Sequence, residues 1–143
     1  MIKNFIIFLF LLSINFKSIA DHVGVIGRQE NYTITKNEVK QLFLLKRKRF
    51  STGELSTLVQ MNSNSTLHKL FVREILGMNI ETYKKIIYNS INSGFNGNII
   101  TVSTQEEMIN KVSTVSNSIG YIDSNIILIN SNYNNITIYK IID

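Results

Sequence analysis

The residues that decide the fold run from Leu55 to Phe71, with the sequence Leu-Ser-Thr-Leu-Val-Gln-Met-Asn-Ser-Asn-Ser-Thr-Leu-His-Lys-Leu-Phe. Leu55, Leu58 and Val59 are typical of a short apolar strand, and the polar residues 62–66 are typical of a turn. After the turn, apolar residues recur at helical spacing: Leu67, Leu70, Phe71 and Ile75. The stretch therefore predicts a strand that ends in a polar turn and leads into a helix.

The helix start in this stretch is a candidate anion site. Asn64 or Ser65 is a natural N-cap, because its side-chain oxygen can accept a hydrogen bond from a first-turn amide. The amides that remain unpaired and the positive end of the helix dipole point the same way, beyond the carboxyl end of the strand. We therefore expect Asn64, Ser65 and Thr66 to contact a bound anion, although the same residue types also cap helices that bind nothing.

The first twenty residues resemble a secretory signal sequence. Lys3 precedes an apolar run over residues 5–14, and the small residues Ser18 and Ala20 precede the expected cleavage point. We expect residues 1–20 to be removed, leaving one exported domain over residues 21–143; a retained N-terminal anchor is the alternative. The sequence contains no cysteine, so neither a disulfide nor a lipid-attachment cysteine is expected.

The charge of the chain argues against a nucleic-acid partner. The chain has 15 basic and 10 acidic residues, a net charge of +5. Loss of Lys3 and Lys17 with the signal sequence would lower this charge to +3. Export separates a protein from nucleic acid, and aromatic residues are not interleaved with the basic ones, so we expect no nucleic-acid binding.

Capping residues predict two further helix starts. Thr35 and Glu38 form a capping box, in which Thr35 bonds a first-turn amide and Glu38 reaches back to the cap. Gly77 is expected to end the helix that follows the polar turn by taking a left-handed conformation, and Asn79 is expected to start the next helix.

The whole chain predicts strands that alternate with helices. Strands are expected over residues 22–27, 99–102 and 118–123, and the isoleucine-rich tail, 126–142, is expected to add one or two outer strands. This alternation is typical of an α/β domain with a mixed, mostly parallel sheet and flanking helices. Such domains generally bind their ligands outside the carboxyl ends of the strands.

The sequence carries no motif for catalysis or metal binding. His22 and His68 are far apart, and neither belongs to a cluster of cysteines or carboxylates, so no metal site is expected. His68 is expected on an exposed helix face. The chain has no nucleophile elbow and no phosphate-binding loop, and Glu106 and Glu107 are explained as capping residues of a helix that begins after Ser103. We therefore expect neither an enzyme nor a cofactor.

The basic run Lys46-Arg47-Lys48-Arg49 has two interpretations. It is a solvated loop at the carboxyl end of a helix, where cations are favoured, or it is a rim or docking patch that attracts anions.

Three segments resemble the periplasmic phosphate-binding protein family, the substrate-binding components of phosphate ABC importers, and especially its short, single-domain members. The segments are Ile34 to Lys46 with Phe50 and Gly53, then Val59 to Phe71, and Ser118-Ile-Gly-Tyr-Ile122. The resemblance implies a type 2 periplasmic-binding-protein fold with a reduced second lobe. It also implies binding of phosphate or another small oxyanion, and an inner-membrane permease as partner.

The resemblance also implies roles for individual residues. Asn64, Ser65 and Thr66 stand where the family has a Ser-Gly-Thr helix start. Possible charge partners of the anion are the basic residues Arg28, Lys46 and Arg47. The cleft is expected to be lined by Gly120, which would allow close backbone approach, and by Tyr121, which would cover the cleft or pack on the sheet.

Met61 is the main departure from the family pattern. The family carries an arginine at this position, four residues before the helix-start serine, and a two-pronged arginine contact is what matches the charge of a buried dianion. Phosphate binding is therefore expected to be weak or lost. The alternative function is that of a degenerate binding domain that acts as a periplasmic adaptor or sensor partner without a ligand.

Overall fold

A mixed five-stranded sheet in the order β4-β3-β5-β1-β6 lies at the centre of the fold. The computed structural model describes residues 23–28, 32–127 and 136–142. The predicted signal sequence and His22 lie outside the described residues. The strands of the central sheet are β1 (Val23–Gly27), β3 (Thr57–Met61), β4 (Asn98–Val102), β5 (Ser118–Asp123) and β6 (Thr137–Ile138).

In the central sheet, the strand pairs that include β3 are parallel and those that include β1 are antiparallel. Strand β3 pairs in parallel with both β4 and β5, whereas β1 is antiparallel to both β5 and β6. Two further strands, β2 (Thr33–Thr35) and β7 (Lys140–Ile142), form a separate parallel pair. Three of the five strand pairs within the described residues are therefore parallel, which confirms the predicted α/β fold with a mixed, mostly parallel sheet.

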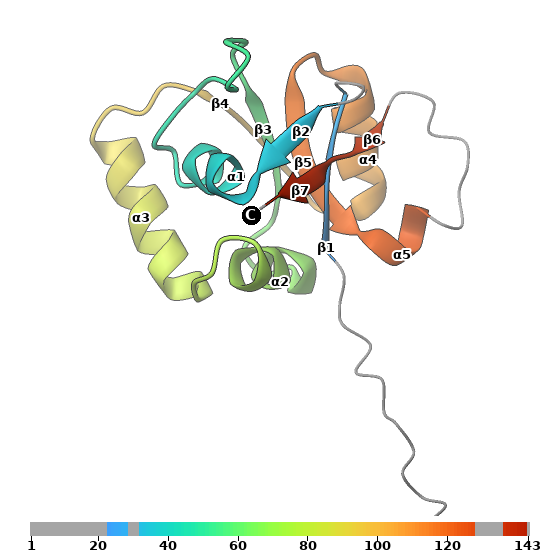
Figure 1. Ribbon diagram of the computed structural model, residues 1–143. Coiled ribbons are helices and arrows are strands. Elements are labelled where there is room, and N and C mark those ends of the chain that lie inside the picture. The colour runs from blue at the N-terminus through green and yellow to red at the C-terminus, as the bar shows by residue number, and fades with distance from the viewer. Residues whose placement is uncertain (1–22, 29–31, 128–135, 143) are drawn as a thin grey trace, which may run out of the picture.

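The helices cover both faces of the central sheet (Figure 1). They are α1 (Lys36–Phe43), α2 (Thr66–Glu74), α3 (Ile80–Asn92), α4 (Gln105–Thr114) and the short α5 (Ser124–Ile127). Successive residues of β5 show the two layers, because side chains alternate between the faces of a strand. Tyr121 stacks on Phe71 of α2, with ring centroids 3.9 Å apart, whereas a Cβ atom on Gly120 would lie 2.5 Å from Met108 Sδ of α4. Among the helices of the described part of the chain, none combines the length and apolar character needed to cross a membrane.

The predicted helix caps are largely confirmed. Ser65, Asn79 and Thr104 are N-caps whose side chains accept hydrogen bonds from first-turn amides. Gly77 has φ of +70°, the left-handed conformation expected at the end of the preceding helix.

Only half of the predicted Thr35–Glu38 capping box forms. Thr35 accepts a hydrogen bond from the Glu38 amide at 3.0 Å, as predicted. The second half is wrong, because the Glu38 carboxylate does not turn back to the cap. Its Oε1 accepts instead from the Tyr32 hydroxyl at 2.7 Å and the Ser51 amide at 2.6 Å. The segment after α1 brings the Ser51 amide to this buried carboxylate, and two donors from distant residues replace the local one.

The prediction that Leu55 belongs to the strand is also wrong. Strand β3 begins at Thr57, and Leu55 lies before it in an isolated bridge with Arg49. The Leu55 side chain is 40% exposed. The buried part of the stretch begins at Ser56, whose hydroxyl donates to the Lys48 carbonyl at 2.9 Å.

Candidate functional site

The turn between β3 and α2 lies at the carboxyl edge of the sheet. Strand β3 ends at Met61 and α2 begins at Thr66. The Asn62 amide donates to the Val102 carbonyl at 3.0 Å, which ties the turn to the carboxyl end of the neighbouring strand β4. Ser65 caps the helix, and its Oγ accepts from the His68 amide at 3.3 Å. The structure thus places the predicted helix start where ligands of parallel sheets generally bind.

The start of α2 is open. The first turn of α2 carries no acidic residue. Within the described residues, no acceptor faces the amides of Thr66 and Leu67. Asn64 and Thr66 are exposed, and Ser65 is half-buried. Exposed hydroxyls beside unpaired amides at the positive end of a helix dipole are what an anion site requires.

Met61 faces this helix start. Its side chain is 5% exposed. The Ser65 hydroxyl donates a weak hydrogen bond to the Met61 Sδ, with 3.7 Å between the Oγ and the Sδ. A side chain at position 61 therefore reaches the first turn of α2. The thioether carries no charge and donates no hydrogen bond, so it supplies nothing to an anion.

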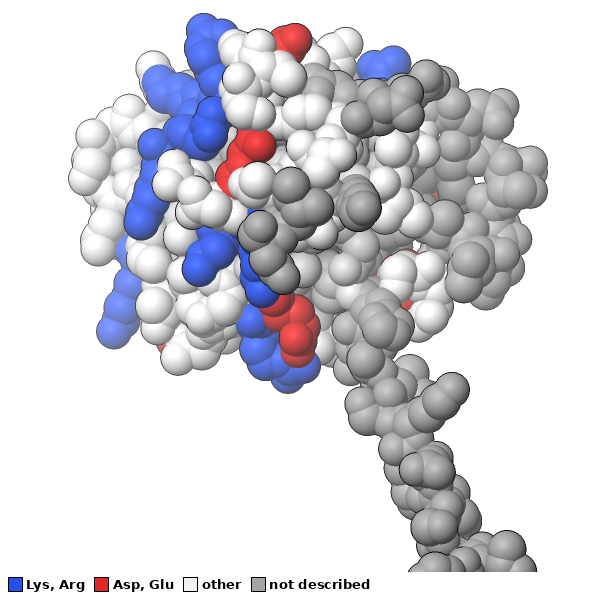
Figure 2. All heavy atoms as spheres, in the orientation of Figure 1, with Lys and Arg blue, Asp and Glu red and all other residues white. Residues whose placement is uncertain are grey.

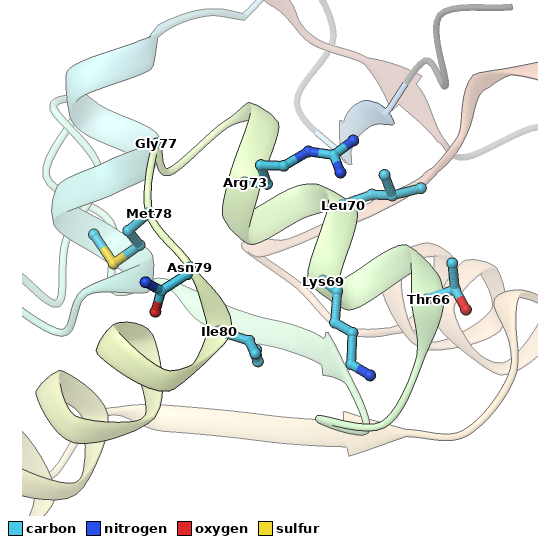
Figure 3. Close-up of a pocket in the computed structure, with 8 residues that line it drawn as sticks. All are labelled: Thr66, Lys69, Leu70, Arg73, Gly77, Met78, Asn79 and Ile80. Carbon is cyan, nitrogen blue, oxygen red and sulfur yellow. The ribbon is translucent and has the colours of Figure 1, made fainter.

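The cation next to the helix start is Lys69, which the sequence analysis did not single out. Thr66, Lys69 and Arg73 line an open groove of about 580 Å³ along α2 (Figure 3). Arg73 is paired with Glu74 at 2.8 Å. Lys69 follows Ser65 by four residues, and that helical spacing is the signal that would have placed its side chain near the cap.

The predicted charge partners lie at the opposite edge of the sheet. Arg28 directly follows Gly27 of β1. Gly27 pairs with Ile119 at the beginning of β5, and Ile119 in turn pairs with Leu58 of β3. Three further residues of β3 lead from Leu58 to Met61, which at about 3.3 Å per residue is about 10 Å. The structure therefore does not bring Arg28 to the start of α2.

Lys46 and Arg47 also lie away from the start of α2. They belong to the basic run after α1, in which Lys46 is exposed and Arg47 half-buried, and the Ser56 amide donates to the Lys48 carbonyl at 2.8 Å, just before β3 begins. The Arg47 Nε donates to the Arg49 carbonyl at 2.7 Å, so part of the run folds onto its own loop. Figure 2 shows basic side chains gathered over the side of the molecule where Figure 1 places α1, α2 and α3.

Gly120 and Tyr121 are buried in the sheet. Tyr121 packs on the sheet, one of its two predicted placements. Its hydroxyl contacts Met61 and His68, on either side of the turn, from the buried side. The hydroxyl oxygen accepts from the Met61 amide at 2.9 Å and is also hydrogen-bonded to the His68 Nδ1. Tyr121 thus supports the turn from the core, whereas Gly120 faces α4, and the role of both as cleft residues stays a prediction.

The prediction that His68 is exposed is wrong. The residue is 2% exposed, and its ring lies 5.4 Å from that of Tyr83, edge to face. Burial, and then the positive charge of Lys84, lower the pKa of His68 to about 4, so the ring is neutral at pH 7. The signal was present in the sequence, because residue 68 precedes Phe71 and Val72 at the i+3 and i+4 spacing of a buried helix face.

The structure gives no indication of a metal centre. Within the described residues, no three or more of histidine, cysteine, aspartate and glutamate gather where they could hold a metal ion.

Solved structures that match this architecture include proteins named for phosphate binding or phosphate transport. PstS from Borrelia burgdorferi superposes with a TM-score of 0.63 at 20% identity, over 85% of this chain and 47% of its own. A substrate-binding protein assigned to a phosphate ABC transporter of Clostridium perfringens, solved with bound phosphate, gives 0.61 at 17% identity. A phosphate transport receptor from Vibrio cholerae gives 0.58 at 9% identity, over 46% of its length.

The chain has the fold of phosphate-binding proteins of ABC transporters. This confirms the architecture that the sequence resemblance implied, in reduced form, because the chain spans less than half the length of these proteins. No protein-family model and no curated protein sequence matches the chain. At these identities the likeness concerns the fold, and the ligand is a separate question.

Proposed function

We propose that this chain is an exported solute-binding domain that holds phosphate or another small oxyanion at the start of α2. The open first turn of α2 carries the proposal, since Thr66 and Leu67 offer unpaired amides beside the Asn64, Ser65 and Thr66 side chains. The names of the structural neighbours support phosphate as the ligand. The role is binding, without catalysis or cofactor. Residues 1–20 would direct the chain to the periplasm, where the permease of an ABC importer would be its partner.

Binding is expected to be weak, because the charge of the anion is poorly matched. Each charge-assisted hydrogen bond contributes about 1.5 to 3 kcal/mol, so a missing two-pronged arginine contact forfeits about 3 kcal/mol or more. At 1.4 kcal/mol per tenfold, affinity falls at least about a hundredfold. Lys69 is exposed, and an exposed cation recovers only about 0.2 to 1 kcal/mol.

Calorimetric titration with phosphate at low salt tests the proposal. Met61→Arg should strengthen binding by at least about tenfold, because position 61 faces the helix start and an arginine there can pair with the anion. Asn98→Arg is the matched control. It adds the same charge at the exposed amino end of the neighbouring strand β4 and should leave the affinity unchanged. Submicromolar binding by the unchanged protein would contradict the weak-binding proposal.

A second candidate function is that of an adaptor or sensor partner without a ligand. It is favoured by the Ser65 hydroxyl, which accepts from the His68 amide and points its proton at the Met61 sulfur instead of at solvent. Absence of phosphate binding in both the unchanged protein and Met61→Arg would support this function. Neighbouring genes for a permease and an ATPase would favour transport, whereas neighbouring membrane-signalling genes would favour the sensor partner.

A further inference from the structure

A second groove lies on the other side of the β3–α2 turn, between the carboxyl ends of β3 and β4 and one face of α3. Its volume is about 430 Å³, within the range of sites for small molecules. The walls include Met61 and Asn62 from the turn, His68 from α2, and Lys84, Tyr88 and Ile91 from α3. The side chains of Asn64, Ser65 and Thr66 are not among its walls.

A hydrogen-bond chain favours one tautomer of His68. The Met61 amide donates to the Tyr121 oxygen, and a His68 Nδ1 that accepts from this hydroxyl gives its one proton a partner, whereas an Nδ1–H would leave that buried proton unpaired. An Nδ1 that accepts is unprotonated, and the neutral ring then carries its proton on Nε2. His68 therefore presents an Nε2–H donor on a side chain that is 98% buried.

This donor opens into the groove. Within the described residues, Nε2 has no hydrogen-bond partner, and none of their fully buried side-chain nitrogen or oxygen atoms lacks one. The Nε2 atom therefore retains some accessible surface, and the groove is the cavity whose lining includes His68. A donor on a largely buried ring, without a protein partner, favours a ligand that brings an acceptor.

The rest of the groove combines one cation with an apolar wall. Lys84 is the only lysine or arginine among the residues that line it, and it also contacts Glu81 at 3.6 Å in an exposed pair that binds the ammonium weakly. Tyr88 and Ile91 lie four and seven residues further along the same face of α3. They are 69% and 50% exposed, among the most exposed large apolar side chains of the described chain.

We propose that this groove binds a small organic monoanion, a carboxylate that carries an apolar or aromatic group. The carboxylate accepts from the His68 Nε2–H and pairs with Lys84, while the apolar group lies on Tyr88 and Ile91. One cation and one neutral donor match a single negative charge, whereas inorganic phosphate, as a dianion, would leave charge uncompensated and the apolar wall uncovered. The inference goes beyond the proposed function and does not depend on it, since the groove lies beside the start of α2 and not at it.

NMR titration of the purified protein with sodium phenylacetate tests the inference. Phenylacetate should shift the backbone amides of Met61, Lys84 and Tyr88 in a saturable way and should shift the His68 Nε2 resonance. Phenylacetamide has the same ring without the charge and should bind several-fold more weakly. Inorganic phosphate should leave the Lys84 and Tyr88 amides unmoved.

Two neighbouring lysines of α3 provide a matched pair of variants. Lys84→Gln should weaken phenylacetate binding by about fivefold, the effect of losing an ion pair with an exposed lysine. Lys85→Gln removes the same charge from an exposed residue outside the groove and should leave the affinity unchanged. Equal effects of the two variants, absence of saturable shifts, or equal shifts by phosphate would each overturn the inference.

Discussion

Two neighbouring parts of this molecule are built on the same plan and differ in one respect. Strands β3 and β4 are parallel neighbours, and each leads into a helix whose N-cap carries a hydroxyl, Ser65 for α2 and Thr104 for α4. The two turns touch, because the Asn62 side-chain amide donates to the Ser103 Oγ at 3.1 Å. Both helix starts therefore lie at the carboxyl edge of the sheet.

The difference is the presence of acidic residues. Helix α4 has Glu106 and Glu107 in its first turn, and the Glu107 Oε2 accepts from the Ser103 amide at 2.8 Å. The first turn of α2 has no acidic residue, and Lys69 follows it. A carboxylate of the chain itself thus occupies the positive end of one helix, whereas the positive end of the other has none, which is why we propose the anion site there. The same arrangement of strand, turn and helix can therefore bind a carboxylate of its own chain, as in a capping box, or leave its first-turn amides free for an anion from solution.

The largest difference between the two parts is expected in their response to acid. Helix α2 is packed through the buried, neutral His68, whereas α4 packs through apolar residues. The pKa of His68 is about 4 in the folded protein and about 6.5 when unfolded, so the unfolded chain binds more protons between these values. The free energy of unfolding should therefore fall by up to about 3 kcal/mol as pH drops from about 6.5 to 4.

Urea denaturation at a series of pH values measures this effect. Above pH 7 the contribution of His68 to stability is complete. His68→Gln removes the titrating group and should flatten the curve between pH 6.5 and 4.5. An equally steep curve in that variant would show that other groups cause the acid sensitivity.

Gly120 is expected to give the next largest effect, on the α4 side of the sheet. A Cβ atom there would lie 2.5 Å from Met108 Sδ and 3.1 Å from Val112 Cγ2. Gly120→Val should therefore lower the free energy of unfolding by about 1 to 3 kcal/mol through overpacking. Gly24 in β1 is the control position, because its Cβ atom would meet nothing closer than 3.7 Å. In thermal denaturation, Gly120→Ala should lower the Tm more than Gly24→Ala, and equal shifts would mean that α4 does not pack tightly on β5.

The two N-caps should be alike in stability and unlike in binding. Ser65→Ala and Thr104→Ala each remove the acceptor of a first-turn amide and should each cost about 1 kcal/mol. Only Ser65→Ala should weaken phosphate binding. Equilibrium denaturation and calorimetry of both variants test the comparison, which fails if Thr104→Ala weakens binding as much.

The smallest change in stability is expected when the first turn of α2 is given a carboxylate, as α4 has. Thr66→Glu places a carboxylate in the open first turn and should stabilise the protein by about 0.3 to 1 kcal/mol through the helix dipole. The same carboxylate should repel phosphate and abolish its binding. Thr66→Gln is the uncharged control and should retain binding. Undiminished phosphate binding in Thr66→Glu would place the anion elsewhere.

The sequence predicted the features that depend on near neighbours. Ser65, Asn79 and Thr104 cap helices because the amide that each satisfies lies three residues away. The fold class followed from the order of strands and helices. The architecture implied by the three segments that resemble phosphate-binding proteins agrees with the structure, although the solved structures that match are at most 20% identical to this chain.

The features that depend on distant residues were not predicted. The Glu38 carboxylate binds Ser51, thirteen residues away, and the Tyr121 hydroxyl binds His68 across 53 residues. Arg28 was named as a possible charge partner, but β1 runs antiparallel to β5 and carries it to the other edge. Strand direction is set by pairing between distant segments, and no local pattern in the sequence records it.

The central claim is that the start of α2, and not that of α4, is the phosphate site of this protein. An NMR titration of backbone amides with phosphate at low salt tests it most directly. The amides of Thr66 and Leu67 should shift and saturate only at high phosphate, whereas those of Gln105 and Glu106 should stay in place. Equal shifts at both helix starts, or no shift at Thr66 and Leu67 while phosphate binds, would contradict the claim.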